Sequence, residues 1–299
     1  MHIITNSNNT INPQNINIST NSPTNTDINS YKNATGFIPY NMTNDYMFRF
    51  VLQKNSHVLK GLVCSLLHLS PNKISSITIT NPLSLGNDFD NNTISLNICI
   101  TLHNNTLITL EMQMANQLHW KEHALHYLCR SYEHIYSKQE YHTKFPVIHV
   151  AFVNFTPFSE SPEFFSTYQL SNKKNYLLYT DNFMLHLMDF THIELATEDD
   201  RQHLLDDWAK LFTAVSWEEI ILLSKKNFCF SEAAQTLFEL NSNETLCLKC
   251  KSRQSYSQHE DTIHKMVETL THELATLNDE NISLKARIAE LEAMAKQNR

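Results

Sequence analysis

The chain has 299 residues, of which 41% are hydrophobic, and its formal net charge at pH 7 is −8. The negative charge excludes a generally basic nucleic-acid binder, so any contact with DNA has to come from a local patch. The three glycines, Gly36, Gly61 and Gly86, are too scattered for a P-loop or a Rossmann fingerprint, and no stretch approaches the roughly 20 apolar residues of a membrane span.

Residues 1–38 are dominated by Asn, Ser, Thr and Ile and carry little charge. Such a segment buries too little apolar surface to offset its chain entropy, so we predict that it is disordered. Its first twenty residues lack a basic segment followed by an apolar one, so we do not expect a secretory signal. Six cysteines do not make a disulfide scaffold at this length, and a cytoplasmic location fits best.

The first ordered elements are expected to be one or two helices over residues 44–69, where apolar residues recur at helical spacing. Asn44 and its neighbours offer an N-cap. Asp45 suits the positive end of the helix dipole, although it is also placed to approach a site from this helix. Pro71 ends the helical region, and residues 73–80 are typical of a strand.

Two segments then alternate between apolar and polar residues with a period of two, over residues 94–102 and 107–114. This pattern predicts two half-buried strands, and the residues between them favour a turn.

The register of these strands decides which side chains meet. If both apolar faces join one core, Ile98 and Leu110 lie on the same side, which requires a loop of odd length such as residues 104–106. The same register gathers Asn97, Glu111 and Gln113 on the other face, as a candidate polar site.

A helix is expected over residues 119–138, followed by a buried strand over 146–153. A helix between two strands allows them to pair in parallel through a crossover connection. Another strand is expected within residues 176–195, and residues 203–242 are expected to be helical.

The C-terminal part carries apolar residues at seven-residue spacing in two columns, which predicts a coiled coil over residues 260–299. Asn281 interrupts the second column, and a buried amide there favours a paired partner in register. The charged residues beside the seam attract their counterparts in a parallel homodimer. The expected seam consists of Ile263, Val267, Leu270, Leu274, Leu277, Asn281, Leu284, Ile288 and Leu291.

These features resemble the PD-(D/E)xK nuclease family transposases, also called recombination-promoting nucleases. The resemblance lies in the order helix, three strands, helix, strand, in the opening TNDYMFR at residues 43–49, in Glu111-Met112-Gln113, and in His126-Tyr127 on the following helix. It continues around residues 185–188 and Trp208 and covers roughly residues 43–253.

The resemblance implies an α/β fold, a PD-(D/E)xK restriction-endonuclease-like core (αβββαβ), here with added C-terminal helices and a coiled-coil tail. The implied activity is Mg²⁺-dependent hydrolysis of DNA. Glu111 then holds the metal and Gln113 positions water. Asn97 falls at the second metal-ligand position, where the family normally has aspartate.

An amide oxygen adds no negative charge to a metal site, so we expect reduced or lost cleavage. The usual turn glycine is replaced by Asn104-Asn105, and His123 stands where the family usually has arginine. Asp88 or Asp90 is an alternative source of a second carboxylate. The competing hypotheses are a catalytically inactive dimer that binds DNA, and an interaction protein that never contacts DNA.

Three further groups of residues have a structural interpretation beside the functional one. A helical face carries His119, His123 and His126 without a metalloprotease motif. Cys247 and Cys250 form a lone CxxC without the second pair that a zinc site needs. Four basic side chains are candidates for contact with a phosphate backbone and equally suit a solvated helix face; they are Lys121, Arg130, Lys138 and Lys144. The domains are therefore expected at 1–38 (disordered), 39–242 (nuclease-like), 243–259 (linker) and 260–299 (coiled coil).

Overall fold

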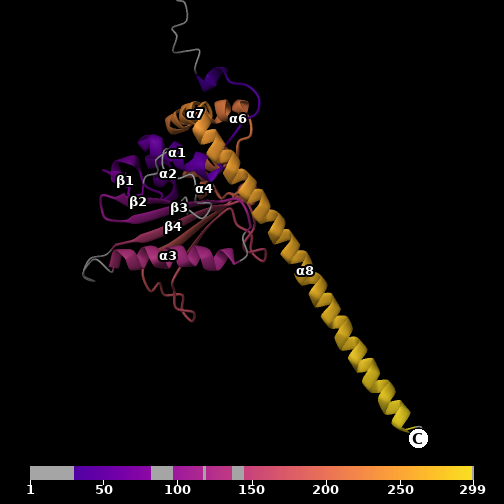
Figure 1. Ribbon diagram of the computed structural model, residues 1–299. Helices are drawn as coiled ribbons and strands as arrows, with labels where there is room; N and C mark the ends of the chain where they lie inside the picture. Colours follow the sequence, from indigo (N-terminus) through magenta and orange to yellow (C-terminus); the bar gives the residue numbers. More distant parts are fainter. Residues whose placement is uncertain (1–29, 82–96, 117–118, 137–144, 298–299) are drawn as a thin grey trace, which may run out of the picture.

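In the computed structural model, a six-stranded mixed sheet lies between one helix on one face and several helices on the other (Figure 1). The structure describes residues 30–81, 97–116, 119–136 and 145–297. The strand order is β1-β2-β3-β4-β6-β5, antiparallel at both edges and parallel across β3, β4 and β6. The predicted α/β class is thereby confirmed.

The N-terminal helical region divides into α1 (Asp45–Lys54) and α2 (Ser56–Leu66). Asn44 caps α1, because its side chain accepts a hydrogen bond from the backbone N–H of Met47. A turn of 3-10 helix at η2 (Pro71–Lys73) follows, and the strand expected over residues 73–80 is the shorter β1 (Ile77–Ile79).

The hairpin of β2 (Ile98–Leu102) and β3 (Leu107–Gln113) has the predicted parity. Ile98 pairs with Leu110, so the apolar faces coincide. The N–H of Leu102 donates to the carbonyl of Thr106, which closes a loop of three residues one position earlier than expected. Its last residue, Asn105, has φ +63°, a left-handed conformation that asparagine tolerates better than most residues.

The helix α3 (Trp120–Tyr136) connects β3 to β4 (Val147–Val153), and the two strands pair in parallel as predicted. Every residue of β4 is buried, which explains its continuous apolar character. The pairing Thr109 with His149 sets which side chains of the two strands share a face.

The second edge of the sheet contains β5 (Phe165–Gln169) and β6 (Phe183–Asp189). β6 is the strand expected within residues 176–195. β5 was not predicted, since its five residues show no clear alternation and its outer half is exposed.

The C-terminal helices lie with α1 and α2 on the side of the sheet opposite α3, where α7 packs on α1 and α2 and α6 packs on α7 (Figure 1). They are η3 (Phe190–Leu195), α4 (Glu198–Gln202), α5 (Leu205–Thr213), α6 (Trp217–Ser224) and α7 (Phe228–Asn241). Phe48, Phe152 and Phe212 pack edge-to-face at the centre of this main core. The smaller core under α3 includes Trp120 and Ala124.

Residues 30–38, the described part of the predicted disordered segment, pack on this helical layer. The 3-10 turn η1 (Tyr31–Asn33) buries Tyr31, whose hydroxyl lies 3.0 Å from that of Ser231. Phe37 forms a β-bridge with Ser216. Ordered structure therefore begins before residue 39, and residues 1–29 lie outside the described residues.

The last helix, α8 (Glu244–Gln297), runs without interruption from the globular domain far beyond it (Figure 1). It includes residues 244–259 of the segment 243–259 expected to be a linker, and Leu246 and Cys250 in this part are buried against the domain. At 54 residues, α8 is about 80 Å long. None of the helices in the described ranges combines the length and the apolar character that crossing a membrane requires.

Candidate functional site

The predicted polar side chains do share one face of the sheet, on the side covered by α3. Asn97 directly precedes Ile98, whose partner is Leu110, so the register places Asn97 beside Glu111. Gln113 is two residues further along β3 and therefore on the same face. All three are buried, with 6–9% of their surfaces exposed. A polar group this deeply buried requires partners, and Glu111 has one.

The partner of Glu111 is His149 on β4. Its Nε2 lies 3.2 Å from Glu111 Oε2, and its Nδ1 lies 2.7 Å from the hydroxyl oxygen of Thr109. With a neutral imidazole, Nε2–H donates to the carboxylate and Nδ1 accepts from the threonine. Because His149 is fully buried, this pair of contacts fixes the orientation of both the ring and the carboxylate.

Aromatic rings extend this contact toward α3. Tyr127 stacks on His149 with ring centroids 6.2 Å apart and an interplanar angle of 26°. His123 meets the edge of Tyr127 at 4.6 Å, and its buried Nδ1 makes no hydrogen bond within the described part of the chain. His119, His123 and His126 do not form a metal-ligand group there. His123 and Tyr127 of α3 instead cover the polar face of the sheet.

The start of β2 is held by Arg49 and Asn81. Arg49 is buried in α1 and donates from Nη1 to the carbonyl oxygen of Asn97 at 2.6 Å. Asn81 donates to the same carbonyl at 2.8 Å and accepts from the N–H of Cys99 at 2.9 Å. Burial lowers the pKa of the Arg49 guanidinium. These contacts fix the backbone at Asn97, and hence its position beside Glu111.

A cavity of about 540 Å³ opens where β3 ends. Gln113, Asp45 and Arg253 of α8 are among the residues that line it. The Asp45 carboxylate pairs with Arg253, and burial raises the pKa of Asp45 although the arginine favours its charged form. Asp45 therefore links α1 to α8 at the wall of this cavity. The helix-dipole role that the sequence suggested did not predict this ion pair.

The other charged candidate residues from the sequence either are exposed on α3 or lie outside the described residues. Asp88, Asp90, Lys138 and Lys144 lie outside them. Lys121 and Arg130 are exposed on α3, and Lys121 Nζ lies 4.3 Å above the ring of Phe158.

The CxxC pair does not gather a metal-ligand group among the described residues. Burial raises the pKa of Cys250 to about 12, so this thiol is protonated near neutral pH. A zinc ligand has to be a thiolate, which disfavours this pair as a zinc site.

The donor atoms on the polar face fit a hard divalent cation only in part. Glu111 supplies one carboxylate, one oxygen of which is engaged by His149, and Asn97 supplies an uncharged amide oxygen. Mg²⁺ is usually held by one or two carboxylates together with substrate phosphates. This set therefore stands at the weak end of that range.

Unrelated proteins share sheets of this kind, so the family is identified by comparison with known protein families. Residues 42–268 match the family described as PD-(D/E)XK nuclease family transposase. The chain belongs to the PD-(D/E)XK nuclease family transposases. No curated protein and no solved structure matches this transposase-family chain.

The site of this transposase-family protein contains one residue that sequence reasoning missed, His149. It is the polar exception in an apolar strand, at a position that the parallel pairing with β3 brings onto the face of Glu111. The signal was present in the sequence as a histidine inside residues 146–153. Its meaning depended on a strand pairing between distant segments.

Proposed function

We propose that this chain has the active-site arrangement of a Mg²⁺-dependent DNA endonuclease but cleaves phosphodiesters weakly or not at all. The observation that carries the proposal is the position of Asn97 beside Glu111. At the second-strand position, an amide replaces the carboxylate that the family pattern normally supplies.

In this proposal Glu111 and Asn97 would hold the cation, which supplies positive charge to stabilise the developing charge on the scissile phosphate. Gln113 orients the attacking water. Its Nε2 donates to the carbonyl oxygen of Ala115 at 2.7 Å, which restricts the orientation of the side-chain amide and leaves its Oε1 as the acceptor atom. His149 keeps the Glu111 carboxylate turned in one direction.

The replacement of a carboxylate by an amide is costly because hard cations prefer charged oxygen ligands. The isosteric change Asn97→Asp restores the charge without altering the shape of the side chain. We expect it to raise the rate of plasmid nicking in Mg²⁺ or Mn²⁺ by about tenfold or more, in the range of changes to a catalytic electrostatic contact. The measurement compares nicking by the natural protein, Asn97→Asp, Glu111→Ala and the double variant.

A matched control is Asn105→Asp, which adds the same charge to the exposed hairpin loop. It should leave nicking unchanged. If Asn97→Asp cuts and loses that activity with Glu111→Ala, the site is where we place it. If the natural protein already cuts as fast as Asn97→Asp, the loss of the carboxylate does not impair catalysis and the proposal is wrong.

The alternative is a catalytically inactive dimer that binds DNA or another partner. Its DNA contacts would come from basic side chains such as Lys121 and Arg130, which are exposed on α3 beside the polar face. Salt-dependent DNA binding without cleavage, in both the natural protein and Asn97→Asp, would favour this alternative. Absence of both binding and cleavage would leave an interaction protein.

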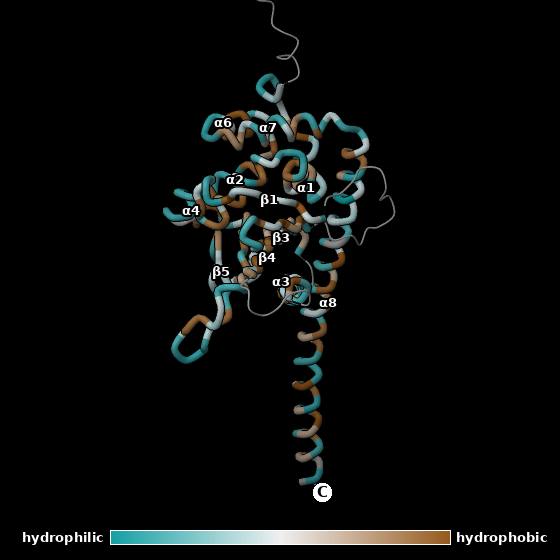
Figure 2. The backbone as a smooth tube through the Cα atoms, turned by 90° about the vertical axis from the view of Figure 1, so that its left-hand side faces the viewer, coloured by the Kyte–Doolittle hydropathy of each residue, from teal (hydrophilic) through white to brown (hydrophobic). Residues whose placement is uncertain are grey.

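The homodimer belongs to the same proposal and rests on α8. The predicted seam residues are solvent-exposed along the helix, from 36% at Val267 to 71% at Leu274. Figure 2 shows hydrophobic positions recurring along α8 beyond the globular domain. A row of exposed apolar side chains at heptad spacing needs a partner, and a second copy of the same helix in register supplies one.

A cytoplasmic location completes the proposal. All six cysteines are free, and Cys64 and Cys250 are buried among core residues. Such thiols suit a reducing compartment.

A further inference from the structure

Three side chains that can bind metals meet at the edge of the helical layer, on elements that do not contribute to the Glu111 face. His68 follows the C-cap residue of α2, while Asp199 and His203 are one turn apart at α4. Each offers a ligand atom, and these atoms all lie within 4.8 Å of one another. It is the one such group of His, Cys, Asp and Glu found in the described part of the chain.

The spacing of this cluster suits a tetrahedral ion. Asp199 Oδ2 lies 3.4 Å from His68 Nδ1, and Asp199 Oδ1 lies 3.4 Å from His203 Nδ1. Ligands at the usual zinc distances stand about 3.4 Å apart along the edge of a tetrahedron. Each imidazole nitrogen therefore already stands at a ligand-to-ligand distance from the Asp199 carboxylate. The two contacts use different carboxylate oxygens, so this exposed carboxylate has to turn to present one oxygen to an ion held by both rings.

The backbone at His68 is unusual in a way that presents its ring to α4. The N–H of Leu69 donates to the carbonyl of Cys64 at 2.8 Å, which closes the end of α2 as a Schellman motif. His68 occupies the left-handed position of that motif, with φ +52°, where glycine is usual. A histidine in place of glycine is a backbone outlier, and such outliers gather at functional sites.

The two imidazoles are stacked, with centroids 3.8 Å apart and an interplanar angle of 7°. Two positive charges at this distance repel each other, and burial together with His203 lowers the pKa of His68. Neutral imidazoles carry the lone pair that a metal needs. Binding has to open the ring stack and displace the His203 contact to the Asp199 carbonyl oxygen, 2.9 Å away. The partly exposed rings and carboxylate have room for both changes.

We propose that His68, Asp199 and His203 form a binding site for a divalent transition-metal ion, with Zn²⁺ as the best match. Two imidazoles and one carboxylate leave a fourth position for water, a ligand set that suits zinc better than the all-oxygen set that Mg²⁺ prefers. The bound ion joins the end of α2 to α4 and so stabilises the packing of these helices. The site is independent of Glu111 and of DNA cleavage.

The test is the binding of Zn²⁺ to the full chain, measured by equilibrium dialysis with metal quantification after treatment with a chelator. Cys247→Ser and Cys250→Ser are placed in the background to remove the paired thiols. We expect one equivalent to bind, and Asp199→Asn and His203→Gln to weaken this binding by about tenfold or more. His57→Gln is the matched control, since His57 is an exposed histidine beside a carboxylate, Glu232. It should keep the full equivalent, as should Glu111→Ala.

The variant His68→Gly separates metal binding from damage to the fold. Glycine fits the left-handed position, so this variant is expected to fold at least as well as the natural protein without metal. Zn²⁺ should raise the melting temperature of the natural protein but not of His68→Gly. An unchanged zinc stoichiometry in Asp199→Asn, or equal stabilisation of His68→Gly by zinc, would overturn the proposal and leave a hydrogen-bonded cluster only.

Discussion

The two histidines in the central sheet are both buried, but they lie on opposite faces and have different surroundings. His149 lies on the α3 face and joins Glu111 to Thr109, whereas His186 on β6 lies on the opposite face, 7% exposed. The Nδ1 of His186 lies 2.8 Å from the Thr167 hydroxyl, and its ring stacks on Phe165. Burial, and secondarily the nearby His68, lower the pKa of His186 from 6.5 to about 4.

This shift makes the stability of the domain depend on pH. The unfolded chain binds the His186 proton near pH 6.5, the folded chain only near pH 4, so the free energy of unfolding falls as the pH decreases through this window. We expect the wild-type protein to lose about 2 kcal/mol more than His186→Asn between pH 7 and pH 5. Urea unfolding at both pH values, with a chelator present, measures this difference. The exposed His126→Asn should behave as the wild type; an equal loss in His186→Asn would refute the assignment.

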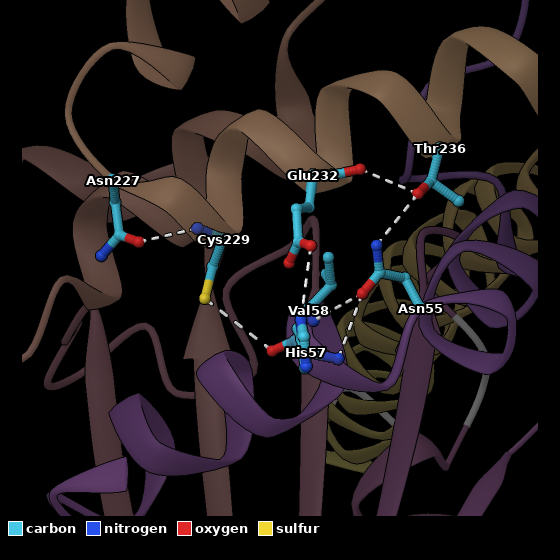
Figure 3. A network of polar contacts seen from close by, with 7 residues as sticks. All are labelled: Asn55, His57, Val58, Asn227, Cys229, Glu232 and Thr236. Atoms are coloured by element: carbon cyan, nitrogen blue, oxygen red, sulfur yellow. Dashed lines mark hydrogen bonds and ion pairs between the residues drawn. The ribbon is translucent and has the colours of Figure 1, made fainter. Parts of the chain in front are cut away.

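At the scale of elements, α2 and α7 are fastened by polar contacts around a close approach (Figure 3). Asn55 caps α2 and also donates to the hydroxyl of Thr236 at 3.3 Å. His57 Nδ1 lies 3.3 Å from a carboxylate oxygen of Glu232, and the Sγ of Cys229 lies 3.8 Å from the His57 carbonyl oxygen. The helices can come this close because Gly61 of α2 has no side chain.

A methyl group at Gly61 has no room. An added Cβ would lie 2.7 Å from Cys229 Sγ and 3.4 Å from Trp208 Cζ2. Gly61→Ala gains helix propensity, but we expect the clash to prevail and the variant to lose about 1–2 kcal/mol of stability, measured by urea unfolding. Adding Cys229→Ala removes the nearest atom and should recover most of the loss. If Gly61→Ala is as stable as the wild type, the two helices are not packed as closely as described.

The central hairpin was predictable because its information is local. Alternation fixed which residues face the core, and the parity of the turn fixed the register that pairs Ile98 with Leu110. The candidate site followed from the same rule, since Asn97, Glu111 and Gln113 are spaced by register and by a period of two. The short edge strand β5 escaped, because five partly exposed residues carry no strong periodic signal.

The remaining site contacts join segments that are far apart in the chain. His149 reaches Glu111 through the parallel pairing of β3 with β4, and 38 positions separate the two residues. Asp45 meets Arg253 across 208 positions. No local pattern specifies such a contact, because it depends on where the whole helical layer packs. The sequence also divided α8 into a linker over residues 243–259 and a coiled coil over 260–299, whereas the helix already begins at Glu244, inside the expected linker.

At the scale of the whole molecule, the distal part of α8 sets the expected oligomeric state. Asn281 lies on this part, and a single buried amide in a seam specifies register and pairing at some cost in stability. Deletion of residues 260–299 is expected to convert a dimer to a monomer, and Asn281→Ile to favour higher oligomers. Light scattering coupled to size-exclusion chromatography measures both. Glu290→Gln, an exposed helix position outside the seam, is the control. An unchanged mass after the deletion would contradict the coiled coil.

The continuity of α8 places two kinds of stability within one helix. Its first turns bury Leu246 and Cys250, so their backbone amides open only when the domain unfolds. Within the part of the chain that the structure describes, its outer turns are exposed on all sides, and isolated helical turns fray readily. For a lone chain, protection from hydrogen exchange and from proteases would therefore fade along the helix. A second chain would extend that protection to the tip, which makes the integrity of the outer helix a function of protein concentration.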